Sequence, residues 1–232
     1  MKSNHYSILI FSETWLHGEI NNHILTADTD FSIIRSDRTG KGGGLAIFLN
    51  NHFNFLIIAE LNNAFINGLI VDILNSIHEP IFRIVAIYLS PKGASSPKAV
   101  DEITDWLSSH VYSDVPISII GDFNFSGYKF IYSNYSNGLL NFLSGINFIQ
   151  MISTPTRDHN FLDLLFTDQP NLISSINVDA PFTSTCDHNV IKFTLDIQNS
   201  PKQKNKAFRD FGSADYEKIN AYLSKLDWKL IL

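Results

Sequence analysis

Short apolar runs separated by turn-forming residues constrain the fold of this chain more than any other feature. In the first half of the chain, several such runs follow one another with no helix-like segment between them. Three successive runs joined only by short polar turns predict an antiparallel meander. In the second half a helix-like segment leads into a strand-like run. This mixture favours an α/β fold, a sandwich in which two sheets pack face to face and helices cover the outside.

The positions of the expected elements follow from these runs and from helix signals. Ser96 is a candidate N-cap with Pro97 at the first helical position, and residues 138–148 form a second helix candidate. Residues 90–93 are expected to break the chain before the first helix. The expected strands cover residues 6–12, 31–36, 45–49, 53–58, 66–74, 81–89, 117–120, 161–167, 172–178 and 190–197.

Composition and charge predict one large domain followed by a basic segment. The chain has 232 residues, of which 44% are hydrophobic and 17% charged. We expect a domain over residues 1–197, then a basic linker and a closing helix capped by Ser213 within 198–232. Residues 1–200 carry 10 Lys and Arg against 19 Asp and Glu, whereas residues 201–232 carry 7 against 4. An acidic body argues against a basic nucleic-acid coat, but it can still bind a polyanion where its carboxylates gather divalent cations.

Two further features bear on location. The chain has one cysteine, Cys186, which excludes an internal disulfide, predicts no disulfide-linked partner and fits a reducing compartment. No window resembles a signal peptide or a membrane span, since the run over residues 8–11 is too short and Glu13 follows at once. We therefore expect an intracellular protein without a membrane partner.

Glycines cluster between two expected strands, at residues 40–44. No Gly-Lys-Ser/Thr motif opens a helix after them, so the cluster does not match a phosphate-cradling loop. Glycines between two strands are more typical of a tight turn and a close approach of backbones.

Polar side chains follow the buried run over residues 117–120. Gly121 is followed by Asp122 and Asn124, with Phe123 between them. Alternate side chains on an extended backbone share a face, so Asp122 and Asn124 are expected to point the same way. A carboxylate can activate a water and a carboxamide can hold an oxygen without adding negative charge, which suits phosphate-ester chemistry. The alternative is an ordinary strand end with an Asx turn.

Acidic residues recur at the ends of, or inside, other apolar strands. A carboxylate among apolar neighbours is costly unless something neutralises it. A cap or a surface ion pair explains any single one, but several together favour a shared cation site. Mg²⁺ prefers oxygen ligands, and no Cys/His set for structural zinc is present. The residues concerned are Glu13, Asp122, Asp163 and Asp187, together with Asn124 and His188.

The adjacent pair Asp187 and His188 is informative because neighbouring side chains usually diverge. Asp187 can face a metal while His188 reaches a phosphate, with Asp163 orienting the imidazolium. Alternatively, His188 merely caps the strand. Cys186 suggests a thiol nucleophile, but nothing near it in the sequence favours the thiolate.

These residues, in this order, resemble the endonuclease/exonuclease/phosphatase superfamily, and within it the apurinic-type endonuclease domain of non-LTR (LINE-like) retrotransposons. The resemblance spans about residues 5–197. The segment Ser-Glu-Thr-Trp-Leu at 12–16 and the segment Gly-Asp-Phe-Asn at 121–124 are part of it. The other matching segments are residues 35–38, 42–47, 85–88, 156–157, 162–167 and 186–191.

The resemblance implies a four-layer, deoxyribonuclease-I-like fold of two packed mixed sheets flanked by helices. It also implies a metal site, in which Glu13 is the principal Mg²⁺ ligand and Asp187 contributes a contact. Mn²⁺ is a possible replacement for Mg²⁺.

Catalytic roles are implied in the same way. Asp122 would activate the attacking water or protonate the leaving oxygen, while Asn124 and Tyr88 would contact the scissile phosphate. His188, oriented by Asp163, would stabilise the transition state. The full implied catalytic set is Glu13, Tyr88, Asp122, Asn124, Asp163, Asp187 and His188.

The implied function is Mg²⁺-dependent nicking of DNA by hydrolysis of a phosphodiester bond, in the nucleus if the enzyme is active. Arg35, Arg38 and Arg157 are candidates for contacts with DNA phosphates, although surface ion pairs explain them equally well. The tail resembles the segment that links such endonucleases to a reverse transcriptase, which would be the partner domain in the parent element. Another phosphoesterase of the same superfamily is an alternative.

One departure from the family concerns the start of the chain. Members of the family open with a strand that carries an Asn supporting the metal, whereas here Asn4 stands too close to Glu13 to be that residue. We therefore expect an N-terminally truncated fold. This departure favours a further alternative, a catalytically impaired remnant of a retrotransposon endonuclease with weak DNA binding or none.

Overall fold

The computed structural model describes residues 6–38, 40, 42–125, 138–197 and 215–225. The chain forms two compact units, residues 1–202 and 203–232. In the second unit, helix α5 (Tyr216–Leu223) begins after Asp215, whose side chain accepts a hydrogen bond of 2.9 Å from the backbone N–H of Lys218. The expected basic linker and the expected cap Ser213 lie outside the described residues, as does Asn4. No helix in the described ranges is long and apolar enough to cross a membrane.

A six-stranded mixed sheet forms the centre of the first unit. Strands β4, β5 and β6 are the expected antiparallel meander. Strand β7 is parallel to β6, and β9 and β8 complete the sheet in antiparallel orientation. In spatial order the strands are β4 (Asn54–Asn62), β5 (Ile66–Leu74), β6 (Pro80–Leu89), β7 (Ile117–Asp122), β9 (Asp163–Thr167) and β8 (Ile149–Gln150).

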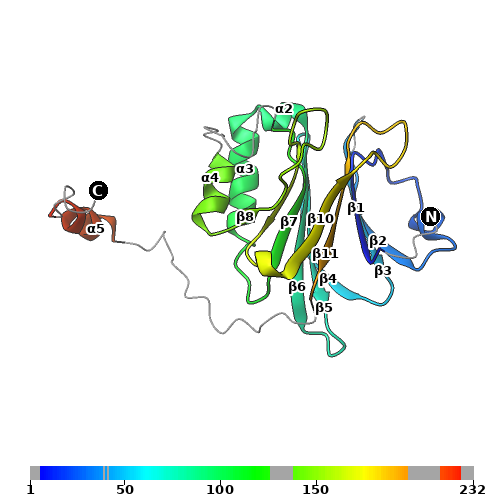
Figure 1. The fold of residues 1–232 in the computed structure, drawn as a ribbon, viewed down its shortest axis with the longest axis horizontal. Coiled ribbons are helices and arrows are strands. Elements are labelled where there is room, and N and C mark those ends of the chain that lie inside the picture. Colours follow the sequence, from blue (N-terminus) through cyan, green and yellow to red (C-terminus); the bar gives the residue numbers. More distant parts are fainter. Residues whose placement is uncertain (1–5, 39, 41, 126–137, 198–214, 226–232) are drawn as a thin grey trace. The chain divides into compact units, whose positions relative to one another are not determined.

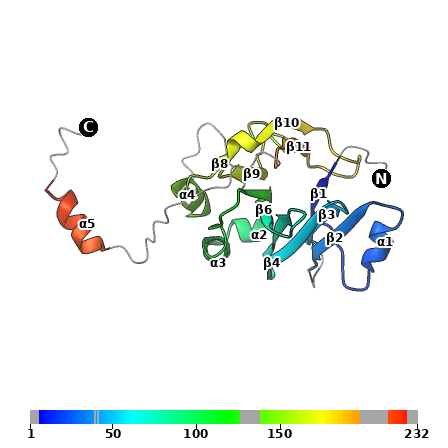
Figure 2. The same ribbon diagram turned by 90° about the horizontal axis from the view of Figure 1, so that it is seen from below.

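A second layer of strands lies on one face of this sheet, and helices α3 and α4 lie on the other face (Figures 1 and 2). The second layer consists of two separate antiparallel sheets, ordered β1-β3-β2 and β10-β11. Its strands are β1 (Ile8–Ser12), β2 (Phe31–Ser36), β3 (Leu45–Asn50), β10 (Ile173–Asp179) and β11 (Val190–Leu195). The helices of the first unit are α1 (Asn22–Thr26), α2 (Pro91–Ala94), α3 (Pro97–Ser108) and α4 (Gly138–Gly145), and a 3₁₀ turn, Pro170–Leu172, precedes β10.

The side chains of β6 alternate between its two faces, and this explains how one face packs against helices while the other packs against strands. Val85 and Ile87 belong to the hydrophobic cluster that includes the apolar face of α3, whereas Ile84 and Ala86 belong to the cluster formed with β1, β2 and β3. All four are at most 1% exposed. Because successive side chains of a strand point to opposite faces, one apolar strand contributes to both cores.

The α/β sandwich predicted from the sequence, with packed layers of strands and helices on the outside, is confirmed, with strand boundaries that differ by a few residues. The second layer of strands is antiparallel and not mixed as expected. Among the described elements, four were not predicted: α1, α2, the short β8 and the 3₁₀ turn Pro170–Leu172. Residues 90–93 do end the strand, since β6 stops at Leu89, and they also form part of the one-turn helix α2, which Ser90 caps through its side chain. Such short helices show no apolar period from which they could be recognised.

Candidate active site

The carboxyl ends of β6 and β7 bring the central site residues to one edge of the sheet. Tyr88 on β6 lies opposite Asp122 on β7, which in turn lies opposite Asp163 on β9. Gly121 permits this approach: its φ is +155°, and a Cβ at this position would overlap the carbonyl oxygen of Ile87. The Gly that precedes Asp122 is therefore required by the contact between the two strands.

Asp122 is 2% exposed and is held by Asn124. Phe123 is fully buried, and the chain turns at Asn124, whose φ is +49°. The backbone N–H and the side-chain amide of Asn124 donate to the two carboxylate oxygens of Asp122, over 3.0 and 2.8 Å. The same amide also donates to the carbonyl of Leu89, over 3.0 Å. The two side chains meet as expected, although by a left-handed turn and not by an extended strand.

His188 and Asp163 form the second part of the site. Nδ1 of His188 lies 2.7 Å from Oδ2 of Asp163, which is the pairing that the resemblance implies. The fully buried Thr156 supports both residues. Its hydroxyl accepts hydrogen bonds from the backbone N–H groups of Leu162 and Asp163, and its carbonyl accepts one from Asn189, next to His188.

Burial and neighbouring charges determine the protonation states of Asp122 and His188 at neutral pH. Burial and the nearby charge of Asp163 raise the pKa of Asp122 to about 7, while the charge of His188 opposes this shift. The hydrogen bond with Asp163 raises the pKa of His188 to about 9, so its ring is cationic at neutral pH. A carboxyl group that titrates near neutrality beside a fixed imidazolium is suited to proton transfer at a phosphate.

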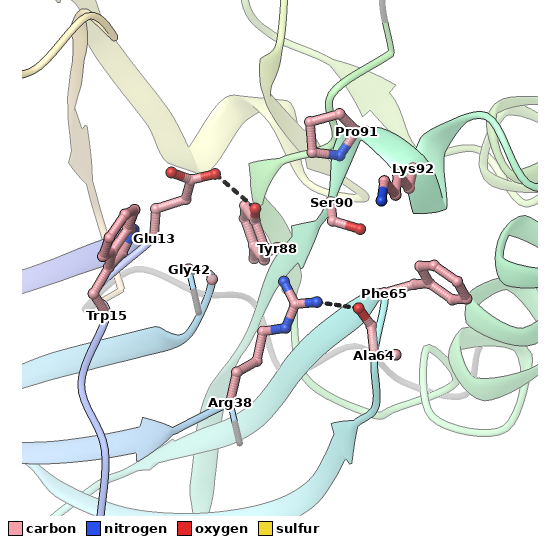
Figure 3. A pocket seen from close by; sticks show the side chains of 11 residues that line it. Glu13, Trp15, Arg38, Gly42, Ala64, Phe65, Tyr88, Ser90, Pro91 and Lys92 are labelled. Atoms are coloured by element: carbon pink, nitrogen blue, oxygen red, sulfur yellow. Dashed lines mark hydrogen bonds between the residues drawn. The ribbon is translucent and has the colours of Figure 1, made fainter. Parts of the chain in front are cut away.

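Glu13 joins this group through Tyr88. The Tyr88 hydroxyl donates a hydrogen bond of 2.6 Å to Oε1 of Glu13, as Figure 3 shows. Burial, and then this bond, raise the pKa of Tyr88 above its ordinary value. Glu13 follows β1 with a φ of +51°, and its charge contributes to the raised pKa of Asp122.

Asp187 is the predicted site residue that is paired with a cation and largely exposed. Its side chain is 66% exposed and forms an ion pair with Arg157, with Oδ2 and Nη2 2.5 Å apart. Arg35 also forms an ion pair, of 3.2 Å with Asp37, and is only 13% exposed. These contacts agree with the ion-pair alternative for Arg35 and Arg157, whereas Arg38 lies in a pocket beside Glu13.

This pocket has a volume of about 390 Å³ and is lined by Glu13 and Tyr88 on one side (Figure 3). The glycine cluster forms part of its wall: Gly42 and Gly43 have φ values of +76° and +74°. The carbonyl of Gly43 accepts a hydrogen bond of 2.9 Å from the backbone N–H of Trp15. The predicted close backbone approach is therefore present, between the loop that joins β2 to β3 and the segment after β1.

Several residues of the site were not predicted. Trp15 and Lys92 line the pocket, and Thr156 supports the His188–Asp163 pair. For Trp15 and Thr156 the signal was available, since both fall inside segments that carry the resemblance. For Lys92 no sequence signal existed, because its position depends on the unrecognised helix α2.

The donor atoms of the site suit a hard divalent cation, because most are carboxylate oxygens. Asp122, Asp163 and His188 each offer a ligand atom within 4.8 Å of the others. His188 and Asp163 already bind each other, and Glu13 is not part of this close group. Asp187, the other ligand that the resemblance implies, pairs with Arg157.

Comparisons with known proteins identify the fold. No family model matches the chain, and no curated protein matches it significantly by sequence. Among solved structures, the endonuclease domain of TRAS1, a telomere-specific non-LTR retrotransposon, is 17% identical with a TM-score of 0.56, covering 83% of this chain and 86% of that one. An AP endonuclease from Archaeoglobus fulgidus is 13% identical with a TM-score of 0.63, covering 84% and 91%.

A 3′ phosphatase from Neisseria, solved with a product DNA hairpin, is 12% identical with a TM-score of 0.60, and the match covers 83% of this chain and 90% of that chain. At these identities the likeness concerns the fold, and it extends over most of each protein. The chain therefore has the deoxyribonuclease-I-like fold that these three proteins share.

Proposed function

We propose that this chain is a metal-dependent phosphodiesterase that nicks DNA, of the type that serves a retrotransposon at its target site. The observation that carries the proposal is the meeting of buried Asp122 with the His188–Asp163 pair on one side and the Glu13–Tyr88 pair on the other. In-line hydrolysis of a phosphodiester needs a proton-transfer group and a cationic group at one phosphate, and this group of residues supplies both.

Asp122 is the proposed proton-transfer residue. With a pKa of about 7 it can accept a proton from the attacking water or give one to the leaving oxygen. Asn124 holds its carboxylate in place with two hydrogen bonds. For Asn124 and Tyr88 to contact the scissile phosphate, as the resemblance implies, each must exchange a present hydrogen bond for one to the substrate.

His188 is the proposed stabiliser of the transition state. Its ring is held by Asp163 through Nδ1, which leaves Nε2 to donate to a phosphoryl oxygen. Glu13 would hold Mg²⁺ or Mn²⁺, and Asp187 would join it only after release from Arg157. When bound, the metal supplies positive charge that offsets the charge of the phosphate oxygens.

The names of the structural neighbours support DNA as the substrate, because they include a retrotransposon endonuclease and an AP endonuclease. As the retrotransposon resemblance implies, we further propose that the domain acts in the nucleus together with a reverse transcriptase encoded by the same element.

Nicking of supercoiled plasmid tests the proposal. We expect conversion to open circles that requires Mg²⁺, stops in EDTA and is lost in Asp122→Ala and His188→Ala. Asp101→Ala on α3 and His52→Ala serve as matched controls, since both residues are exposed and neither lines the pocket. Folding of each variant is checked by circular dichroism. Nicking at equal rates in the wild type and in folded Asp122→Ala would reject the proposal.

A second candidate is removal of a terminal phosphate, as in the Neisseria neighbour that is named a 3′ phosphatase. The same site residues would act on a monoester. An oligonucleotide with a 3′ phosphate distinguishes the two: release of inorganic phosphate without plasmid nicking favours the phosphatase. A folded wild-type protein that does neither reaction, with Mg²⁺ or Mn²⁺ present, favours the impaired remnant.

A further inference from the structure

The pocket beside Glu13 and Tyr88 combines features that the proposed reaction does not use. Its lining adds two cationic and two aromatic side chains, Arg38, Lys92, Trp15 and Phe65. They come from segments far apart in the sequence and surround one space in Figure 3. Its volume of about 390 Å³ lies within the range typical of small-ligand sites.

One of its two cations, Arg38, is held in place by a hydrogen bond. The guanidinium of Arg38 donates to the carbonyl of Ala64, and the absence of a side chain at Gly43 makes room for the Arg38 chain. Lys92 reaches toward the pocket from α2 (Figure 3). In the described part of the chain, neither cation forms an ion pair with a carboxylate. Two such cations in an acidic body form a local site for phosphate.

The aromatic side chains offer stacking surfaces. Trp15 is 65% exposed and Phe65 is 38% exposed, so both rings present accessible apolar surface. Trp15 has a φ of +55°, and its backbone N–H is bonded to Gly43. The ring lies against Gly42, where an added Cβ would approach within 3.9 Å. The chain thus keeps an exposed indole in a fixed place, at a cost in backbone strain.

We propose that this pocket binds an unpaired nucleotide next to the scissile phosphate, with its base stacked on Trp15 and its phosphate between Arg38 and Lys92. This inference rests on the proposed function for the identity of the polymer. A base within a duplex already has both faces covered, so stacking on Trp15 requires a single-stranded or extruded nucleotide. The site therefore favours single-stranded, frayed or distorted DNA over a regular duplex.

Binding of a short single-stranded oligothymidylate in EDTA tests the inference without cleavage. We expect the oligonucleotide to quench tryptophan fluorescence, and the quenching to disappear in Trp15→Phe. By fluorescence anisotropy, Trp15→Ala should weaken binding about 10-fold to 100-fold, whereas Trp15→Phe should keep most of the affinity. A regular duplex of the same length should bind with no dependence on Trp15.

The salt dependence of oligonucleotide binding distinguishes the proposed contact of Lys92 with the phosphate from the proposed stacking of the base on Trp15. Lys92→Ala should reduce the slope of log affinity against log salt by about 0.7, whereas Trp15→Ala should leave the slope unchanged. Lys98→Ala is the matched control, because Lys98 is also exposed and close in sequence but does not line the pocket. Equal affinities and slopes for wild type, Trp15→Ala and Lys92→Ala would overturn the inference.

The inference and the proposed function can fail separately. If Trp15 and Lys92 prove irrelevant to binding while the wild type nicks plasmid, the pocket assignment is wrong and the nuclease stands. If binding depends on both residues but no cleavage occurs under any condition, the pocket stands and the proposed reaction is wrong.

Discussion

At the scale of single residues, the contact between His188 and Asp163 changes the protonation of His188. Through that protonation it makes the free energy of unfolding depend on pH. The pKa of His188 is raised from the ordinary value of 6.5 to about 9, mainly by the hydrogen bond with Asp163. The folded state therefore binds the proton more tightly than the unfolded state. The resulting stabilisation is complete below pH 6.5 and is lost as the pH rises through about 9.

We accordingly predict that His188→Gln loses more stability at low pH than at high pH. Urea denaturation at pH 6 and at pH 10 measures the difference between the wild type and His188→Gln. The expected result is a large difference at pH 6 that shrinks at pH 10. His52→Gln, at an exposed histidine, should show no such change. A difference that grows with pH would mean that the imidazolium is not stabilised by Asp163.

Thr156 is a second residue whose effect can be measured. Thr156→Val keeps the shape of the side chain but removes the acceptor for two backbone N–H groups, those of Leu162 and Asp163. We predict a loss of about 1–3 kcal/mol in the free energy of unfolding, together with slower nicking, because Asp163 is no longer fixed. Thr194→Val on β11, at an exposed threonine, is the control and should change neither quantity much. Unchanged stability of Thr156→Val would contradict the role assigned to the hydroxyl.

At the scale of elements, the strands were largely predictable and the short helices were not. The runs at Phe31–Ser36 and Ile66–Leu74 match β2 and β5 at both ends, because apolar β-branched residues there are bounded by turn residues. Helix α2 spans Pro91–Ala94, too few residues to show an apolar period. Its cap, Ser90, is visible in the sequence, but Ser-Pro is equally common in turns.

The candidate site was predictable where the resemblance covers it and not where it depends on packing. Asp122, Asn124, Asp163 and His188 do converge, since Asp122 ends β7, Asp163 begins β9, and Asn124 and His188 lie in loops within two residues of a strand. The pocket was not foreseen, because it exists only when the glycine loop docks on Trp15 and α2 brings Lys92 near Arg38. These contacts join segments that share no local sequence pattern, so the sequence alone does not reveal them.

The pairing of β6 with β7 is the contact between elements on which the site depends. Gly121→Ala would place a Cβ onto the carbonyl oxygen of Ile87 and push apart the strands that carry Tyr88 and Asp122. We predict a loss of about 3 kcal/mol or more in the free energy of unfolding. Gly145→Ala is the control, since a Cβ there meets nothing within 4 Å, and it should shift stability by less than about 1 kcal/mol. Equal effects of the two substitutions in urea denaturation would refute the explanation given for Gly121.

At the scale of the whole molecule, the six-stranded sheet and its two covering layers differ in how completely they are buried. Every residue of β5 except Leu74 is buried, whereas every residue of β1 is partly exposed. Among the described residues β1 pairs only with β3, and β11 pairs only with β10. The fold therefore carries its site on the well-packed central sheet, while Glu13 follows a strand with one open edge.

The central claim is that residues distant in the sequence act as one catalytic centre, which a double-mutant cycle on plasmid nicking tests most directly. Asp122→Asn and His188→Ala should each lower the Mg²⁺-dependent rate about 10²-fold to 10⁴-fold. Because both residues would act on the same phosphate, the double variant should be little slower than the slower single variant. Contradiction would come from single effects that multiply in the double variant, or from a single variant that nicks as fast as the wild type.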